Sequence, residues 1–258
     1  VIPHITNRIK EFIKNDVSKE DFVICEIGGT VGDIESLPFL EAIRQFSNEL
    51  GRKNTLFIHL TLVPYMKASD EIKTKPTQHS VKELRSLGIQ PDILLCRADR
   101  EIPADERKKI GLFCNVKHDC VIQAINANTI YEVPINFKNE EFDRRVLEYF
   151  NLDASREIDL KMWSQVSRHI LNPDGEVIIG IVGKYTGLAD AYKSLNEALS
   201  HGGIFNEVKV NLKWIESDEL DEVNIAQKLS SCNGILVPGG FGERGSEGKI
   251  MAINYARM

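Results

Sequence analysis

One stretch of the chain places carboxylates beside glycines: E-I-G-G-T-V-G-D-I-E-S, from Glu26 to Ser36. It directly follows an apolar run, F-V-I-C from Phe22, which is typical of a strand buried on both faces. An acid at the end of such a strand is a natural Mg²⁺ ligand, because this hard cation prefers oxygen donors and can hold phosphate oxygens. Glu26 is therefore a candidate metal ligand. The alternative is a glycine turn whose acids face water, since G-G-x-x-G alone is not specific.

A second polar stretch, K-T-K-P-T-Q from Lys73 to Gln78, gathers cations, hydroxyl groups and an amide. Lysines provide charge for phosphate groups, while hydroxyl and amide groups fix the orientation of a ligand. A solvated lysine-rich loop is equally compatible with these residue types. Pro76 disfavours helix at Lys75, so a helix is expected only over 79–87, ending at Gly88.

The glycines of V-P-G-G-F-G, which begins at Val237, follow another predicted strand. Consecutive glycines can direct backbone N–H groups at one point, as an oxyanion hole requires, or they can form a flexible turn. Gly248-Lys249 superficially resembles a phosphate-binding loop. That match is rejected, because Glu243 stands where the loop needs glycine and Ile250 where it needs a hydroxyl group.

Buried apolar runs that alternate with helical patterns must position these residues, and they predict an α/β fold with two doubly wound, mainly parallel sheets. The predicted strands span 21–27, 55–63, 91–96, 120–125, 177–182, 207–215 and 234–237. The predicted helices span 1–14, 36–50, 79–87, 104–114, 139–150, 190–201 and 224–231. Ser36 is expected to cap the second of these helices, and His59 is expected to be a core histidine.

Composition sets limits on function. The chain has 258 residues, of which 42% are hydrophobic and 27% charged, as in a soluble globular protein of one large or two medium domains. The net charge of −6 gives no general attraction to nucleic acid or to an anionic membrane, so neither is expected as a partner. A cytoplasmic location is expected, because no apolar run approaches the length of a transmembrane helix and no signal peptide is evident.

The cysteines fit the same picture. The chain has five, none in a C-x-x-C pair, which suits a reducing compartment. Cys114, His118 and Cys120 lie close together in sequence, but three potential ligands without a fourth predict no zinc site. The chain begins at Val1 rather than at methionine, and we expect it to be a segment of a longer protein.

Five motifs in order resemble the CTP synthase family: E-I-G-G-T-V-G-D-I-E-S from Glu26, K-T-K-P-T-Q from Lys73, C-R-A-D-R from Cys96, G-K-Y from Gly183 and V-P-G-G-F-G from Val237. The resemblance implies a ligase that converts UTP to CTP with ATP, Mg²⁺ and glutamine. ATP would phosphorylate the uracil 4-oxygen, and ammonia from glutamine would displace the phosphate. It also implies GTP as an allosteric activator, CTP as an inhibitor and a homotetramer.

The resemblance implies a domain order as well. Residues 1–152 would be the C-terminal part of a synthetase domain, 153–175 a linker containing the turn N-P-D-G, and 176–258 the N-terminal part of a class I glutamine amidotransferase domain. Carried over position by position, the resemblance assigns the following roles. Glu26 would bind Mg²⁺; Asp33, Ile34, Glu35, Lys73, Thr74, Lys75, Pro76, Thr77, Gln78 and Lys109 would bind UTP or CTP; Ile125, Asn126 and Ala127 would lie by the adenine of ATP; Gly239 and Gly240 would form the oxyanion strand for glutamine; and Arg244, Gly245 and Glu247 would belong to a lid linked to GTP activation.

The sequence also departs from the family's pattern. It contains neither the phosphate-binding loop nor the G-x-C-x-G nucleophile elbow of the glutaminase, and Cys232 precedes its strand rather than following it. An acid is often found where Asn126 stands. We therefore expect these 258 residues alone to be inactive. Two alternatives remain open: a non-catalytic relative that binds pyrimidine nucleotides or forms assemblies, and another ATP-dependent ligase of the same fold, similar to dethiobiotin synthetase.

Overall fold

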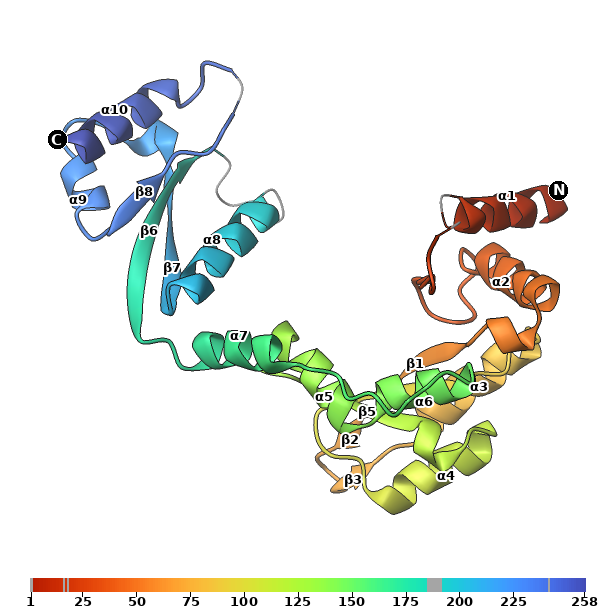
Figure 1. Cartoon of the computed structure of the whole chain (residues 1–258). Coiled ribbons are helices and arrows are strands. Elements are labelled where there is room, and N and C mark those ends of the chain that lie inside the picture. The colour runs from red at the N-terminus through yellow and green to blue at the C-terminus, as the bar shows by residue number, and fades with distance from the viewer. Residues whose placement is uncertain (1, 16, 18, 185–191, 241) are drawn as a thin grey trace. The chain divides into compact units, whose positions relative to one another are not determined.

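The computed structural model describes residues 2–15, 17, 19–184, 192–240 and 242–258 (Figure 1). The chain forms two compact units, Val1–Leu160 and Lys161–Met258, and each contains a parallel sheet, which confirms the predicted α/β class. The division falls inside the predicted linker; the full domain assignment stays a prediction. Tyr185 of the G-K-Y motif, the predicted helix start at Asp190 and Phe241 lie outside the described residues.

The sheet of the first unit has the strand order β1-β4-β5, and both pairs are parallel. The strands are β1 (Ile58–Leu62), β4 (Ile93–Ala98) and β5 (Val121–Ile125), with a separate antiparallel hairpin of β2 (Tyr65–Met66) and β3 (Glu71–Ile72). The helices are α1 (Ile2–Lys14), α2 (Leu37–Leu50), α3 (Lys75–Ser86), α4 (Ala104–Cys114), α5 (Val133–Asn139) and α6 (Phe142–Tyr149), with short 3-10 helices at Arg52–Asn54, His118–Cys120 and Ile130–Glu132.

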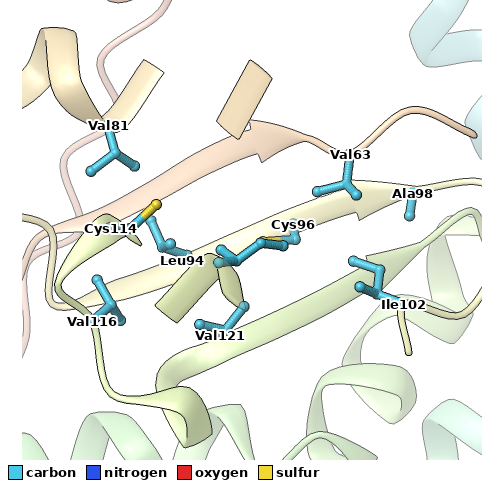
Figure 2. Packing of buried hydrophobic residues seen from close by; sticks show 10 residues of the cluster. Val63, Val81, Leu94, Cys96, Ala98, Ile102, Cys114, Val116 and Val121 are labelled. Carbon is cyan, nitrogen blue, oxygen red and sulfur yellow. The ribbon is translucent and has the colours of Figure 1, made fainter. Parts of the chain in front are cut away.

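The core of this unit lies between β4 and the helices α3 and α4. Figure 2 shows Leu94 and Cys96 of β4 beside Val81 of α3, Cys114 of α4 and Val121 of β5. All five side chains are buried. Burial of this apolar surface is the main favourable term in folding, and it fixes the end of each strand relative to α3 and α4.

The apolar sequence of β1 predicts burial on both faces of the strand. In the structure, only one face is buried. His59 Nε2 lies 2.8 Å from Ser80 Oγ, and Thr61 accepts a hydrogen bond from Thr77, so α3 packs on the face that these two strand residues share. The alternate residues Ile58, Leu60 and Leu62 are exposed. His59 is thus a hydrogen-bonded histidine beneath a helix, and burial lowers its pKa.

The prediction of a strand over 21–27 is wrong. These residues are not in a ladder with any described strand, and Ile24 is 94% exposed. An apolar run indicates that a segment tends to be covered, but a strand also needs a neighbour for its backbone groups. α2 begins at Leu37 as expected, yet the Ser36 hydroxyl caps nothing; it donates to Asp33 O at 2.8 Å.

Two helix predictions also need correction. α3 begins at Lys75 rather than at 79, because Pro76 occupies its first turn, where the missing N–H has no helical acceptor to lose. The helix predicted over 139–150 begins three residues later, as α6 at Phe142, since Glu141 has a φ of 55° and separates it from α5.

The second unit has the strand order β7-β6-β8, again parallel. α7 forms within the segment predicted as a linker and contacts α8 and β7. Cys232 packs against Gly180 of β6, where an added Cβ would lie 2.9 Å from Sγ. The elements are α7 (Lys161–Leu171), β6 (Gly175–Gly183), α8 (Lys193–Phe205), β7 (Val208–Glu216), a 3-10 turn at Ser217–Glu219, α9 (Ile225–Leu229), β8 (Gly234–Leu236) and α10 (Ser246–Arg257).

Among the described residues, every helix is too short or too polar to span a bilayer.

Candidate functional site

A cavity of about 540 Å³ lies where β1 and β4 end, which is the edge at which parallel α/β sheets usually bind ligands. Its wall includes Arg97, Asp99 and Asn126. Arg97 Nη2 donates to Asn126 Oδ1 at 2.8 Å, so the side chain predicted to lie by adenine is held by a neighbouring strand. Ile125 ends β5, and Ala127 is half-buried immediately after Asn126.

A second cavity, of about 400 Å³, is lined by the β2–β3 hairpin and α4. The predicted nucleotide ligand Lys109 lines it together with Glu71 and Glu106. Arg100 and Tyr65 form another part of the wall, with the guanidinium 3.2 Å from the ring centroid. The lining holds two cations beside four carboxylates, since Asp70 and Glu101 also belong to it, so an anionic ligand must displace carboxylates from the cations in order to bind.

Two of the three lysines predicted to bind the nucleotide, Lys73 and Lys109, have a carboxylate partner. Lys73 Nζ binds the carboxylate of Glu71, two residues earlier on the hairpin. Lys109 Nζ donates to Glu106 Oε2 at 3.2 Å. The pKa of Glu71 is lowered, mainly by hydrogen bonds from Lys73 and Ser69, with a smaller attraction from Lys109. The structure therefore brings both lysines into the field of one carboxylate.

The first turn of α3 turns two of its predicted ligands inward. The Thr77 hydroxyl is buried and donates to Thr61 Oγ1 and to Leu62 O, both at 3.1 Å. Thr74 is also buried and accepts a hydrogen bond from Gln78 Nε2 at 3.1 Å. Of the six residues Lys73 to Gln78, Lys75 and Pro76 are the exposed ones.

The glycine-rich loop of Glu26 to Glu35 is exposed, but it is anchored beside α3. Ile27 and Val31 pack against the cluster that contains Leu84 of α3. Thr30 N donates to Asp33 Oδ2 at 3.1 Å, Asp33 is exposed, and Ile34 is 82% exposed. In the described part of the chain, no three His, Cys, Asp or Glu side chains are grouped to hold a metal ion. Glu26 therefore offers a single carboxylate.

In the second unit, lysines hold the glycine loop that follows β8. Lys249 Nζ donates to Pro238 O at 2.9 Å, and Lys184 Nζ donates to Gly242 O at 2.9 Å. These two carbonyls flank the candidate oxyanion residues Gly239 and Gly240.

The candidate lid residues lie just beyond this loop. Arg244 binds the carboxylate of Asp218. Gly245 has a φ of 69°, a conformation that favours glycine, and Glu247 stands in the first turn of α10.

Glu71 and Glu106 are not among the site residues predicted from the sequence, and Lys249 is predicted only as part of a rejected phosphate-loop match. Spacing could have indicated the two acids. Residues three apart meet on a helix, as Glu106 and Lys109 do, and Glu71 at the end of β3 is only two residues from Lys73. The contact of Lys249 with Pro238 O depends on tertiary packing and has no such local signal.

Comparison with known proteins gives two family matches. The family described as CTP synthase N-terminus matches residues 1–152, and glutamine amidotransferase class-I matches residues 187–258. A CTP synthase from Pelagibacter ubique is 63% identical over 258 residues, which cover all of this chain and 48% of that protein. A CTP synthase from Paramagnetospirillum magneticum is 61% identical over 257 residues, covering 100% of this chain and 47% of that protein.

The chain thus spans about half the length of the curated relatives it matches. Because the CTP synthase N-terminus accounts for 152 of its 258 residues, and the amidotransferase match follows it in the same chain, the chain belongs to the CTP synthase family.

Proposed function

We propose that this chain carries the pyrimidine-nucleotide site and part of the glutamine site of a CTP synthase, a ligase that converts UTP to CTP. The observation that carries the proposal is the succession of the two family matches, synthetase first and amidotransferase second, in one chain. In this reaction ATP phosphorylates the uracil 4-oxygen. Ammonia released from glutamine then adds at C4 of the uracil ring, and the phosphate leaves from the same carbon.

The second cavity supports a role in binding the phosphates of UTP or CTP. Lys109 lines this cavity, and Lys73 borders it through its partner Glu71. In this proposal the carboxylates of Glu71 and Glu106 give way when a triphosphate binds. Lys75 is exposed in the first turn of α3, where an anion also meets the positive end of the helix dipole. Thr74, Pro76 and Thr77 shape that turn, and Gln78 reaches it through Thr74.

The exposed residues Asp33, Ile34 and Glu35 supply the remaining polar contacts to the pyrimidine nucleotide in this proposal. The first cavity receives the adenine of ATP beside Ile125, Asn126 and Ala127, with Arg97 fixing the amide of Asn126. The first assignment rests on a motif that this chain shares with the family, and the second on the position-by-position resemblance and on the cavity beside Asn126.

Glu26 fits Mg²⁺ as one ligand of a shared set, because Mg²⁺ is usually bound through one or two carboxylates together with phosphates and water. Its carboxylate is exposed at the end of the extended segment and free to turn toward a bound nucleotide. When bound, the metal ion would neutralise charge on the transferred phosphoryl group.

In the second unit, we assign Gly239 and Gly240 to the oxyanion strand for glutamine, and Arg244, Gly245 and Glu247 to the lid that responds to GTP. The close approach of α10 to the 3-10 turn supports a defined position for that lid: a Cβ on Gly245 would lie 2.2 Å from Ser217 Oγ. The homotetramer, GTP activation and a cytoplasmic location belong to the same proposal.

The proposal is tested with a hybrid enzyme in which residues 1–258 replace the matching segment of the Pelagibacter ubique relative. We expect the hybrid to form CTP from UTP, ATP and Mg²⁺ with either glutamine or ammonium, as measured by chromatographic separation of the nucleotides. Residues 1–258 alone should form none. A hybrid that binds UTP but never forms CTP would favour the non-catalytic alternative.

Lys73 gives the corresponding test of the site. Lys73→Ala in the hybrid should raise the KM for UTP about tenfold, the equivalent of about 1.4 kcal/mol, because a charge-assisted contact to phosphate is lost. Lys82→Ala is the matched control, since Lys82 is exposed on α3 and lies outside the K-T-K-P-T-Q stretch. Equal KM values for the two variants would contradict the assignment.

A further inference from the structure

A lysine of α10 donates a hydrogen bond to the backbone of the loop that follows β8. Lys249 lies in the first turn of that helix, is half-buried, and donates from Nζ to Pro238 O at 2.9 Å. The other end of the loop is fixed twice, because Gly242 O accepts from Lys184 Nζ at 2.9 Å and from Ser246 Oγ at 3.2 Å. Among the described residues, Lys249 is the side chain that holds the Pro238 end.

This contact determines where the next N–H group points. The Pro238–Gly239 peptide is trans and planar, so its C=O and its N–H point in opposite directions. Since the carbonyl of Pro238 points at the Lys249 ammonium, the N–H of Gly239 must point to the other side of the loop. A rotation of this peptide plane would lose the lysine contact and move the N–H together with it.

The ammonium also strengthens that N–H as a donor. A cation bound to the carbonyl polarises the whole peptide unit, as in any chain of hydrogen bonds at low local dielectric. Gly240 leaves room for this arrangement, because a Cβ at that position would lie 3.2 Å from Lys249 Nζ. A larger residue at this position would press on the ammonium group and require it to shift by a few tenths of an ångström.

We propose that Lys249 is a positioning residue for glutamine hydrolysis: it orients and polarises the Gly239 N–H that stabilises negative charge developing on the side-chain amide oxygen of glutamine. This inference rests on the proposed function of the chain. Lys249 acts through the Pro238–Gly239 peptide and touches neither glutamine nor the developing charge.

The test uses the hybrid enzyme and compares its glutamine-dependent with its ammonium-dependent formation of CTP. Lys249→Met should lower kcat with glutamine about 10- to 100-fold, because loss of an oxyanion-hole donor costs about 10²–10³ and a misaligned donor retains part of that effect. The KM for glutamine and the rate with ammonium should change less than twofold. Lys249→Arg, which keeps a cationic donor, should recover part of the lost kcat.

Two further variants separate positioning from folding. Lys184→Met should have the smaller effect, since Ser246 still holds Gly242 O, and Lys209→Met, on the exposed part of β7, should have none. If Lys249→Met lowers the ammonium-dependent rate as much as the glutamine-dependent rate, the role is structural and the inference is wrong. It is also wrong if kcat with glutamine is unchanged. A hybrid without glutamine-dependent activity before any substitution would instead refute the proposed function itself.

Discussion

The Thr77 hydroxyl lies 3.1 Å from the Thr61 hydroxyl and the same distance from Leu62 O, which ties the first turn of α3 to the end of β1. Thr77→Val keeps the shape of the side chain but leaves buried acceptors without a donor. The expected loss is about 1–3 kcal/mol of unfolding free energy for the first unit, the usual penalty for a buried unsatisfied polar group. Thr77→Ser retains the hydroxyl and should lose less.

Urea unfolding followed by two signals measures this loss. Far-UV circular dichroism reports both units, whereas the two tryptophans of the chain, Trp163 and Trp214, both lie in the second unit. The dichroism transition of the first unit should move to lower urea in Thr77→Val while the tryptophan transition stays in place. A shift of both transitions together would contradict a role confined to the junction of α3 and β1.

Glu71 and Glu106 compete with phosphate for the lysines of the second cavity. Replacing either carboxylate by its amide frees a cation that lines or borders the cavity, so Glu71→Gln and Glu106→Gln should bind CTP more tightly. The gain should be at most about fivefold in Kd, because solvent screens exposed ion pairs and makes them weak. Titration calorimetry of the hybrid enzyme with CTP at low salt measures it.

Asp105→Asn is the matched control for this pair of variants. It frees Lys108 on the same helix and at the same three-residue spacing, but Lys108 does not line the cavity. An equal gain in Asp105→Asn would mean that only net charge had changed. A Kd that does not respond to Glu71→Gln would remove Glu71 from the site.

Neighbouring glycines near the end of α8 should respond in opposite directions to alanine. Gly203 is buried, and a Cβ there would lie 2.6 Å from Val210 Cγ2 and 2.7 Å from Val208 O, so Gly203→Ala should destabilise the second unit by about 1–3 kcal/mol. Gly202 has open space, and Gly202→Ala should stabilise the unit by about 0.5–1 kcal/mol by restricting the unfolded chain. Tryptophan fluorescence during urea unfolding measures both. A loss in both variants would show that α8 does not tolerate substitution at either face.

The sequence predicted correctly the strands that are covered by other elements of the same unit. The bounds of β4 and β6 differ from the predicted ranges by only one or two residues at each end. In β4, the run Ile93-Leu94-Leu95 is apolar on both faces of the strand and is covered on both. The same pattern failed at Phe22–Ile27, because hydrophobicity does not identify the neighbour that a strand must pair with. The β2–β3 hairpin was missed because two residues in each strand give no periodicity to detect.

The candidate site could be predicted in composition but not in arrangement. The lysines of the second cavity were predicted from their types and from the family resemblance. Their pairing with Glu71 and Glu106 has a signal in local spacing, whereas the inward position of Thr77 depends on the packing of α3 against β1. The sequence therefore gives the chemistry available at this edge of the sheet, whereas the fold decides which groups remain free for a ligand.

Glu41 and Arg44 on α2 provide a test of stability against pH. Hydrogen bonds from Arg44, at 2.9 and 2.7 Å, and from Gln45 lower the pKa of the Glu41 carboxyl to about 2. Because the folded pKa is depressed, the contribution is present above the unfolded value near 4.5 and is lost as the pH falls toward 2. Solvent screens this half-exposed pair, so Glu41→Gln should destabilise the first unit at pH 7 by only about 0.2–1 kcal/mol.

The difference in unfolding free energy between wild type and Glu41→Gln, measured by urea unfolding at several pH values, should be constant from pH 7 to pH 5 and shrink below that. A difference that persists unchanged to pH 3 would mean that the carboxylate charge contributes nothing and that packing of the side chain explains the effect.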